Sequence, residues 1–398
     1  MNVLICTFSF PSPRNNVHDG KFVFSEAMAY AEAGAEVRVL TPHFKGALRH
    51  ERMCQGLSVH RVTYFLPRTL QVLKRPGQPI YRQKSFLAVF QVPFLCLSFF
   101  LAILRHARWA DIIHAQWTHT ALLALPAKWF LGKKVVLTAR GSDIRLIPGW
   151  LNRFIHRNVD GAIDCFGPQP WNEELKKKFP ARYIPLPLIV HPGRSNGMPE
   201  DMKCRLSPKK DPFVVLYVGR FDRIKLEQNH LPLFELVHAA GLLKSAGRDF
   251  HIFYIGGGDR GIEGRLERAI RDHDVQDVVT WLGPKVNVLD YMRFCHLGVG
   301  GIAFNGVSQE FTINGKPQIL MRGRDNTHTP WNDGINALFV MPGDPQGVAE
   351  RLLWAMDHRE ELEKMGKRAR KDMKPYMVDS RCGGRIYLAA FDRLIKGD

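Results

Sequence analysis

The most constraining feature of this chain is an alternation of strand and helix patterns that stops at a proline-rich stretch and then starts again. A short apolar run at residues 2–8 is followed by a glycine-bearing loop, a helical pattern at 23–33 and a strand pattern at 36–42. Strand, loop, helix and strand make one βαβ unit, and strand patterns recur at residues 110–117, 133–141 and 159–166. The first half therefore predicts a parallel sheet covered by helices.

The stretch at residues 185–212 holds six prolines and no sustained periodicity, which is typical of a domain boundary. After it, strand patterns at 213–220, 250–258, 278–283 and 297–304 alternate with helical patterns, and residues 344–396 are helical. We predict an N-terminal Rossmann-like domain at residues 1–190, a linker at 191–211, a C-terminal Rossmann-like domain at 212–375, and a C-terminal helix at 376–398 that packs toward the N-terminal domain. The predicted fold class is α/β, with two such domains facing across a cleft. Open α/β sheets bind ligands at the carboxyl ends of their strands.

Charge and cysteine content limit the partners and the compartment. The chain has 398 residues and a net charge of +18, which favours an anionic partner such as a phosphate-bearing substrate, a membrane surface or nucleic acid. No helix-turn-helix, RNA-binding or zinc signature supports nucleic acid. Seven scattered cysteines without a C-x-x-C spacing indicate a reducing compartment, and residues 1–5 open directly into a strand pattern. We expect a cytoplasmic protein.

An uncharged stretch at residues 85–104 breaks the alternation. It is long enough to span a bilayer, but it contains Gln91 and Pro93, and the βα pattern resumes directly after it. No acidic residue occurs between Arg52 and Ala110, whereas nine Lys or Arg residues do. Three readings stay open: a buried helix interrupted at Pro93, a surface in peripheral contact with anionic lipid, and a spanning helix.

Candidate binding residues follow the predicted strands. Arg220 and Lys225 come after the strand at 213–220, and such a pair suits a diphosphate or forms an ordinary charged surface. Glycines at a helix start, such as Gly256 and Gly257, allow backbone to approach a phosphate, and Gly20 precedes the first helix in the same way.

Past the strand at residues 133–141, Arg140 could face a phosphate, and Asp143 could orient a substrate or cap a helix. The chain shows no Walker loop, G-x-S-x-G, H-E-x-x-H or metal-ligand spacing. Cations, glycine loops and single carboxylates suit a site that holds an activated phosphorylated donor and stabilises its departing diphosphate.

The order of the motifs VLYVGRFDRIK, FYIGGGD, VTWLG, GIAFNGVSQEFTINGKPQI and NDGINALFVMPGDPQGVAERL resembles the C-terminal domain of glycosyltransferase family 4. HDGKFVFSEAMAYAEAGAEVRVLTP, ADIIHAQW and LTARGSD are similar to landmarks of that family's acceptor domain. The resemblance implies a retaining enzyme of GT-B fold that transfers a sugar from a nucleotide-sugar co-substrate without metal or cofactor. A glycan or lipid-linked glycan is the implied acceptor, in polysaccharide assembly for the cell envelope.

The resemblance also implies roles for single residues. Arg220 and Lys225 match the pair that contacts the donor diphosphate, and Glu310 matches the second glutamate of an E-x7-E motif, which binds the nucleotide ribose. Gly256, Gly257, Gly20 and Gly315 are implied around the nucleotide, and His18, Arg140 and Asp143 on the substrate side.

The sequence departs from the family at the sugar subsite. Ile302 stands where the first glutamate is usual, RGRDNTHTP replaces a G-G-x-x-E stretch, and Arg140 replaces a common histidine. A catalytically degenerate GT-B protein that binds sugar nucleotides or acts as a scaffold therefore stays as the alternative function.

Overall fold

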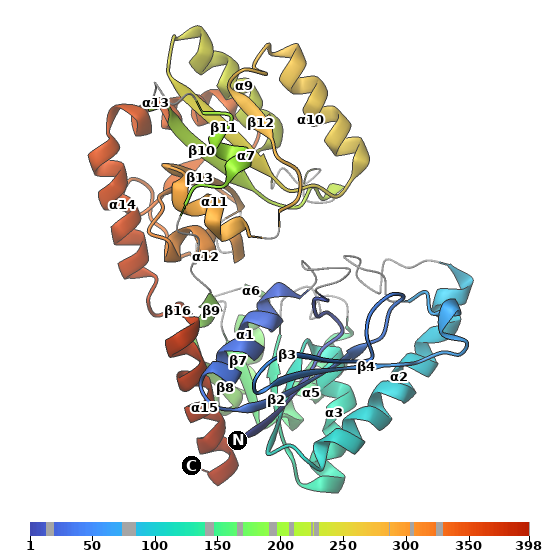
Figure 1. Ribbon diagram of the computed structural model, residues 1–398. Coiled ribbons are helices and arrows are strands. Elements are labelled where there is room, and N and C mark those ends of the chain that lie inside the picture. Colours follow the sequence, from blue (N-terminus) through green and yellow to red (C-terminus); the bar gives the residue numbers. More distant parts are fainter. Residues whose placement is uncertain are drawn as a thin grey trace. The chain divides into compact units, whose positions relative to one another are not determined.

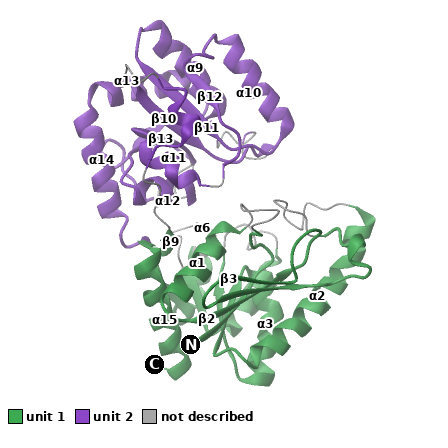
Figure 2. Cartoon of the chain, viewed as in Figure 1, with its two compact units in different colours: residues 1–190, 378–398 green, residues 191–377 purple. Residues whose placement is uncertain are grey.

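The computed structural model describes residues 1–12, 20–73, 85–139, 147–164, 170–190, 197–206, 211–223, 226, 231–285, 287–302, 306–323 and 329–397. It divides the chain into two compact units (Figure 2). Unit 1 comprises residues 1–190 and 378–398, and unit 2 comprises residues 191–377. Each unit has its own sheet and its own hydrophobic core. The first boundary between the units follows Val190, directly before the predicted proline-rich linker.

Within the described residues, unit 1 is built on an eight-stranded sheet of order β3-β4-β2-β1-β5-β6-β7-β8. All neighbours are parallel except the hairpin-like pair β3–β4 at one edge. The strands are β1 (Asn2–Cys6), β2 (Glu36–Pro42), β3 (His50–Cys54), β4 (Leu57–Val62), β5 (Ile112–Gln116), β6 (Lys134–Thr138), β7 (Gly161–Asp164) and β8 (Tyr183–Pro185).

Side chains alternate between the two faces of this sheet, and each face packs a different set of helices. Leu4, Cys6 and Leu137 share a core with α2 (Phe86–Ala107), α3 (Thr118–Leu131) and α5 (Gly149–Asn158). The opposite face, where His114 points, contacts α1 (Lys21–Glu32) and α15 (Ser380–Lys396) (Figure 1). A 3₁₀ turn at Arg68–Leu70, helix α6 (Pro170–Lys178) and a 3₁₀ turn at Pro180–Arg182 complete unit 1.

The C-terminal helix α15 belongs to unit 1, although the chain reaches it only after completing unit 2. Gly384 lies so close to the backbone of Ala29 that a Cβ would collide with the Ala29 carbonyl. Tyr387 packs against Tyr30 with ring centroids 5.7 Å apart, and β16 (Met377–Asp379) pairs with β9 (Leu188–Val190). The predicted return of the C-terminal helix to the N-terminal domain is confirmed.

Unit 2 is built on a parallel sheet whose described strands lie in the order β12-β11-β10-β13-β14-β15. The strands are β10 (Phe213–Val218), β11 (Phe250–Ile255), β12 (Val279–Trp281), β13 (Leu297–Ile302), β14 (Gln318–Met321) and β15 (Leu338–Val340). Helices α9 (Leu233–Ser245), α10 (Arg260–Asp272) and α13 (Pro345–Asp357) pack on one face around Val215 and Tyr217. Helices α11 (Val288–Phe294) and α12 (Gly306–Ile313), with the short α7 (Glu200–Lys203), cover the other around Val214 and Leu216. Helix α14 (Arg359–Asp372) follows α13 and contacts α12.

The structure corrects one of the three open readings of residues 85–104. The helix at residues 86–107 is not interrupted at Pro93 but runs through it. Pro93 is exposed, so its ring points toward solvent and away from the packed side of the helix. Loss of one backbone hydrogen bond on the outer side is tolerated because core contacts hold the inner side.

Candidate functional site

The strand order of unit 2 locates its ligand edge. The chain moves from β10 outward to β11 and β12 on one side, and from β13 outward to β14 and β15 on the other. The topological switch point therefore lies between β10 and β13, and ligands of open α/β sheets bind outside the carboxyl ends of the strands at that point. The residues that follow Val218, and the helix that follows β13, are positioned to contact a ligand.

Arg220 is positioned at this switch point. The Gly219 N–H donates to the Ile255 carbonyl (3.1 Å) and the Phe221 N–H donates to the Gly257 carbonyl (3.0 Å), so the loop after β10 is fixed to the loop after β11. Arg220 lies between these two bonds with an exposed side chain, and it has no ion pair within the described part of the chain. Its guanidinium is therefore available to an anionic ligand.

The glycines after β11 shape the same edge. Gly256 has φ +139°, and a Cβ there would collide with the Gly219 carbonyl. Its carbonyl accepts from the Trp281 indole N–H (2.9 Å), and its N–H donates to the Gly283 carbonyl (3.1 Å). Gly256 is thus required for the close approach of three loops. This structural role accounts for the glycine, and no bound ligand is needed to explain it.

Acidic side chains already occupy much of the N-terminus of α10. Asp259 Oδ1 accepts from the N–H groups of Gly261 (2.9 Å) and Ile262 (3.2 Å), and Glu263 accepts from Gly258 (2.8 Å). Among residues 256–262, the amides of Gly257 and Arg260 alone have no acceptor in the described structure. These two amides, rather than the whole helix end, could bind a phosphate.

Glu310 lies on α12, the helix that follows β13 across the switch point from Arg220. Its neighbours Ser308, Gln309 and Phe311 are buried, whereas Glu310 is half-exposed. Sequence reasoning missed Gln309, whose side-chain oxygen and nitrogen are both buried without a hydrogen-bond partner among the described residues. A buried amide with neither end satisfied is rare and marks a position where a ligand group could bind. The signal available in the sequence was its place directly before Glu310.

The structure does not bring Gly315 to this edge. Gly315 has φ +68° and forms the turn between α12 and β14, before a strand rather than after one. In a parallel sheet the start of a strand lies at the amino edge, opposite the ligand edge. We therefore assign Gly315 to the turn and remove it from the nucleotide site.

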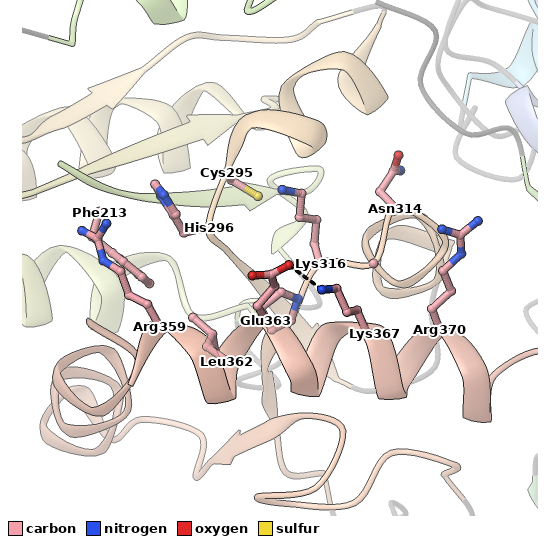
Figure 3. A pocket seen from close by; sticks show the side chains of 12 residues that line it. Phe213, Cys295, His296, Asn314, Lys316, Arg359, Leu362, Glu363, Lys367 and Arg370 are labelled. Carbon is pink, nitrogen blue, oxygen red and sulfur yellow. Dashed lines mark ion pairs between the residues drawn. The ribbon is translucent and has the colours of Figure 1, made fainter. Parts of the chain in front are cut away.

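A basic cavity of about 570 Å³ opens at that amino edge (Figure 3). Lys316, Arg359, Lys367 and Arg370 line it, together with the single carboxylate Glu363. A hydrogen bond from Lys367 lowers the pKa of Glu363, and burial, with the nearby charge of Arg359, lowers the pKa of His296. Because the cavity lies beside the starts of β10, β13 and β14, it is separate from the switch-point site.

In unit 1 the switch point lies between β1 and β5. Gly20, at the start of α1, has φ +66°, and a Cβ there would collide with the Ser9 carbonyl, so glycine allows the loop after β1 to fold against α1. Trp117, directly after β5, has φ +73° without being a glycine, which is a strained conformation of the kind that clusters at functional sites. Its indole packs beside Phe22 (5.7 Å between ring centroids) and stacks on His119 (6.2 Å). Trp117 is a second candidate that sequence patterns did not indicate.

Beneath this edge lies a buried polar network. The Gln116 amide donates to the carboxylate of Glu26 (2.6 Å), which is fully buried on α1, and His114 Nε2 lies 2.8 Å from the Thr138 hydroxyl. Such a network fixes α1 against β5 and β6 and so holds the loop ends in place. The remaining predicted residues, Lys225, His18, Arg140 and Asp143, lie outside the described residues, as does the side chain of Ile302.

The chain is similar to a known domain family over part of its length and to solved structures over its whole length. Residues 20–163 match the sequence profile of the glycosyl transferase 4-like domain. Among solved structures, sucrose-phosphate synthase from Thermosynechococcus elongatus is 17% identical, with a TM-score of 0.71, over 100% of both chains. HepE from Anabaena, in complex with UDP-glucose, is 13% identical, with a TM-score of 0.66, over 98% of this chain and 99% of that one. Trehalose-6-phosphate synthase is 11% identical, with a TM-score of 0.68, over 99% of each chain.

No curated protein is significantly similar to the chain in sequence. The structural similarities cover both units and establish the GT-B fold, as predicted. The glycosyl transferase 4-like match supports the resemblance to glycosyltransferase family 4 over residues 20–163, and the structural similarities show the fold.

Proposed function

We propose that this GT-B protein, which carries a glycosyl transferase 4-like domain, transfers a sugar from a nucleotide-sugar donor to a glycan or lipid-linked glycan. The observation that carries the proposal is the position of two residues at the switch point of unit 2. Arg220 follows β10 on one side, and Glu310 lies on the helix that follows β13 on the other. A cation without a carboxylate partner among the described residues suits the donor diphosphate, and a half-exposed carboxylate suits ribose hydroxyls as an acceptor. HepE, which shares the fold, is in complex with UDP-glucose.

The chemistry proposed for the transfer is leaving-group stabilisation. As the bond between sugar and diphosphate breaks, negative charge grows on the diphosphate, and Arg220 with Lys225 would neutralise it. Transfer without a metal and with retention of anomeric configuration is proposed from the family resemblance. Chelator should leave the activity intact, and activity restored by magnesium or manganese after chelation would contradict this part.

The compartment proposed is the cytoplasm. The six cysteines in the described part of the chain are all free, which supports a reducing environment. Polysaccharide assembly for the cell envelope is the proposed process, since a glycan acceptor would belong to it.

Calorimetry with the full chain tests the nucleotide site. The first ligand is UDP, followed by GDP and ADP. Sugar nucleotides that contain the nucleoside diphosphate that binds are then measured. Arg220→Ala should weaken binding at least about tenfold, because a hydrogen bond to a charged group contributes roughly 1.5–3 kcal/mol. Arg370→Ala is the matched control, since Arg370 is an exposed arginine at the opposite edge of the same sheet. Equal effects of the two substitutions would argue against the site.

The alternative is a catalytically degenerate protein that binds sugar nucleotides or acts as a scaffold in polysaccharide assembly. It is favoured by Ile302 and by the RGRDNTHTP stretch in place of the family's sugar-subsite residues. Incubation with the sugar nucleotide that binds, followed by detection of released nucleoside diphosphate with and without glycan acceptors, separates the two. Tight binding without any turnover would select the alternative.

A further inference from the structure

Helix α2 has an outer side that is as apolar as its inner side. Its 22 residues reach a mean hydropathy of 2.4 over their most apolar window, and only 28% of that window is buried. We define the α2 outer face by six exposed residues: Phe86, Val89, Phe90, Phe94, Leu97 and Leu101. Phe86 is 88% exposed and Val89 is 61% exposed. A helix on the surface of a water-soluble domain normally turns polar side chains outward, so something apolar is expected to cover this one.

The inner side of α2 is fixed to unit 1. Ala88, Leu95, Phe99 and Ile103 are fully or almost fully buried at helical spacing. Phe99 and Ile103 share the core between the helix and the sheet, and α2 packs along α3 (Figure 1). The buried Gln91 side chain donates to the Leu70 carbonyl (2.6 Å) and accepts from the Val72 N–H (3.1 Å). A spanning orientation would break these bonds and expose the apolar face of the sheet to water. The packing therefore favours a helix that lies along a surface rather than one that crosses a bilayer.

A groove of about 530 Å³ lies beside the α2 outer face. Its apolar side includes Phe65, Leu66 and Phe94, and its charged side is formed by Arg49 and Arg68. Neither arginine has an ion pair within the described part of the chain. Phe94 belongs both to the groove and to the outer face, so the basic and apolar surfaces are continuous. This combination matches a lipid, which joins an anionic headgroup to apolar chains.

Neighbouring helices of the same layer also expose large apolar side chains. Trp129 and Phe130 on α3 are 50% and 77% exposed, and Trp150 on α5 is 64% exposed. Helix α3 contacts both α2 and α5. Tryptophan is favoured where hydrocarbon meets headgroups, because its ring is apolar and its N–H is polar.

The charges around α2 favour an anionic partner. Arg105 and Arg108 are exposed at the C-terminal end of the helix, and residues 52–110 contain no acidic side chain. We propose that the α2 outer face, together with the Arg49–Arg68 groove, docks unit 1 on anionic membrane lipid, with α2 lying in the plane of the interface. This inference does not rest on the proposed glycosyl transfer, and its test needs no nucleotide.

The experiment is flotation of the full-length protein with vesicles of phosphatidylcholine, alone and with rising fractions of phosphatidylglycerol. Binding should rise with phosphatidylglycerol and fall in high salt, since the electrostatic part decays within a Debye length of about 10 Å at 0.1 M salt. Phe86→Gln/Leu97→Gln/Leu101→Gln should remove binding at every lipid composition. Arg105→Glu/Arg108→Glu should reduce binding to the anionic vesicles at least about tenfold.

Matched controls come from unit 2. Ile335→Gln/Met341→Gln removes two exposed apolar side chains and Lys364→Glu/Lys371→Glu reverses two exposed charges, and both variants should float like the wild type. Circular dichroism confirms that each variant is folded. Alkaline carbonate should release the bound protein, because a helix that lies in the interface is peripheral.

Three results would overturn the proposal. They are absence of flotation with anionic vesicles at low salt, resistance to carbonate, and equal loss of binding in the unit 2 controls. A fourth result would assign the face to a second copy of the chain. In that case the wild type is dimeric without lipid and does not float, and the triple variant of α2 is monomeric.

Discussion

At the residue scale, Glu310 is the group whose proposed partner is most specific. It lies half-exposed on α12, beside the switch point, while its neighbours on the helix are buried. Glu310→Gln keeps the shape but replaces an acceptor-only carboxylate with a group that also donates. We expect the variant to lose affinity for the ribonucleotide more than for its 2′-deoxy analogue, by roughly tenfold, because a bond to a charged group is lost only with the former. Calorimetry with both ligands measures the difference. Equal losses would place Glu310 away from the ribose.

Arg61 connects Pro11, in the loop after β1, to the β3–β4 edge of unit 1. Its side chain is fully buried and donates to Glu51 (2.8 Å), the Leu48 carbonyl (3.0 Å) and the Pro11 carbonyl (2.9 Å). Arg61→Ala leaves a nearly buried carboxylate and two carbonyls without their donor. We expect a loss of about 3 kcal/mol in the free energy of unfolding, measured by urea denaturation.

The control for Arg61 is Arg368→Ala. Arg368 is exposed and reaches Asp372 across 3.7 Å on the surface of α14. Exposed pairs of this kind contribute roughly 0.3–0.5 kcal/mol, so the two variants should differ severalfold. Similar losses would show that the buried bonds of Arg61 add little.

Some residues of the candidate site could be predicted from the sequence. Others could not be predicted, for physical reasons. Arg220 was predictable because a cation directly after a strand pattern must lie at a carboxyl edge. Gly315 was placed wrongly, although its turn was predicted correctly, because a turn before a strand lies at the other edge. Trp117 could not be predicted, since a positive φ is a property of the folded backbone. The place of Gln309 before Glu310 was visible in the sequence, but the burial of its amide is a property of the folded core.

At the element scale, the loop after β11 depends on Gly256. Alanine would place its Cβ against the Gly219 carbonyl at a φ of +139°. The loops after β10 and β11 would then separate, and Arg220 would move with them. We expect Gly256→Ala to lower the free energy of unfolding by about 2 kcal/mol and to weaken nucleotide binding together with it.

Gly264→Ala provides the contrast within the next element. Gly264 lies inside α10, and an added Cβ meets nothing within 4 Å. Alanine there should raise stability by roughly 0.5–1 kcal/mol and leave nucleotide affinity unchanged. Thermal unfolding and calorimetry on both variants provide the comparison, and a Gly256→Ala protein with wild-type affinity would contradict the loop argument.

The strand and helix patterns of both units were predictable because alternation and helical spacing follow directly from burial. The outer side of α2 was not, since an uncharged run has the same sequence whether it is enclosed in a core or exposed on one side. Only the positions of the sheet and α3 show that one stripe of this helix is covered.

At the scale of the whole molecule, the two units have separate cores, so a change in one can alter its stability without altering the other. His251 is a suitable probe of unit 2. It lies on β11 with 5% of its surface exposed, and its Nε2 lies 2.9 Å from the Thr280 hydroxyl. Burial, reinforced by the positive charge of Arg205, lowers the pKa of His251 from 6.5 to about 4.

A lowered histidine pKa means that the unfolded chain binds a proton more readily than the folded one. The contribution of His251 to stability is therefore fully present above pH 6.5 and is lost as the pH falls toward 4, by up to about 3 kcal/mol.

We expect His251→Gln to flatten this decline, because glutamine can keep a hydrogen bond to Thr280 without a titrating group. Urea denaturation followed by tryptophan fluorescence at neutral pH and near about pH 5 measures the slope, with His358→Gln, an exposed histidine at the end of α13, as the control. A decline that stays as steep in His251→Gln as in the control would place the acid sensitivity elsewhere. The half-buried His60 in unit 1, whose pKa burial lowers to about 4, would then be the next residue to replace.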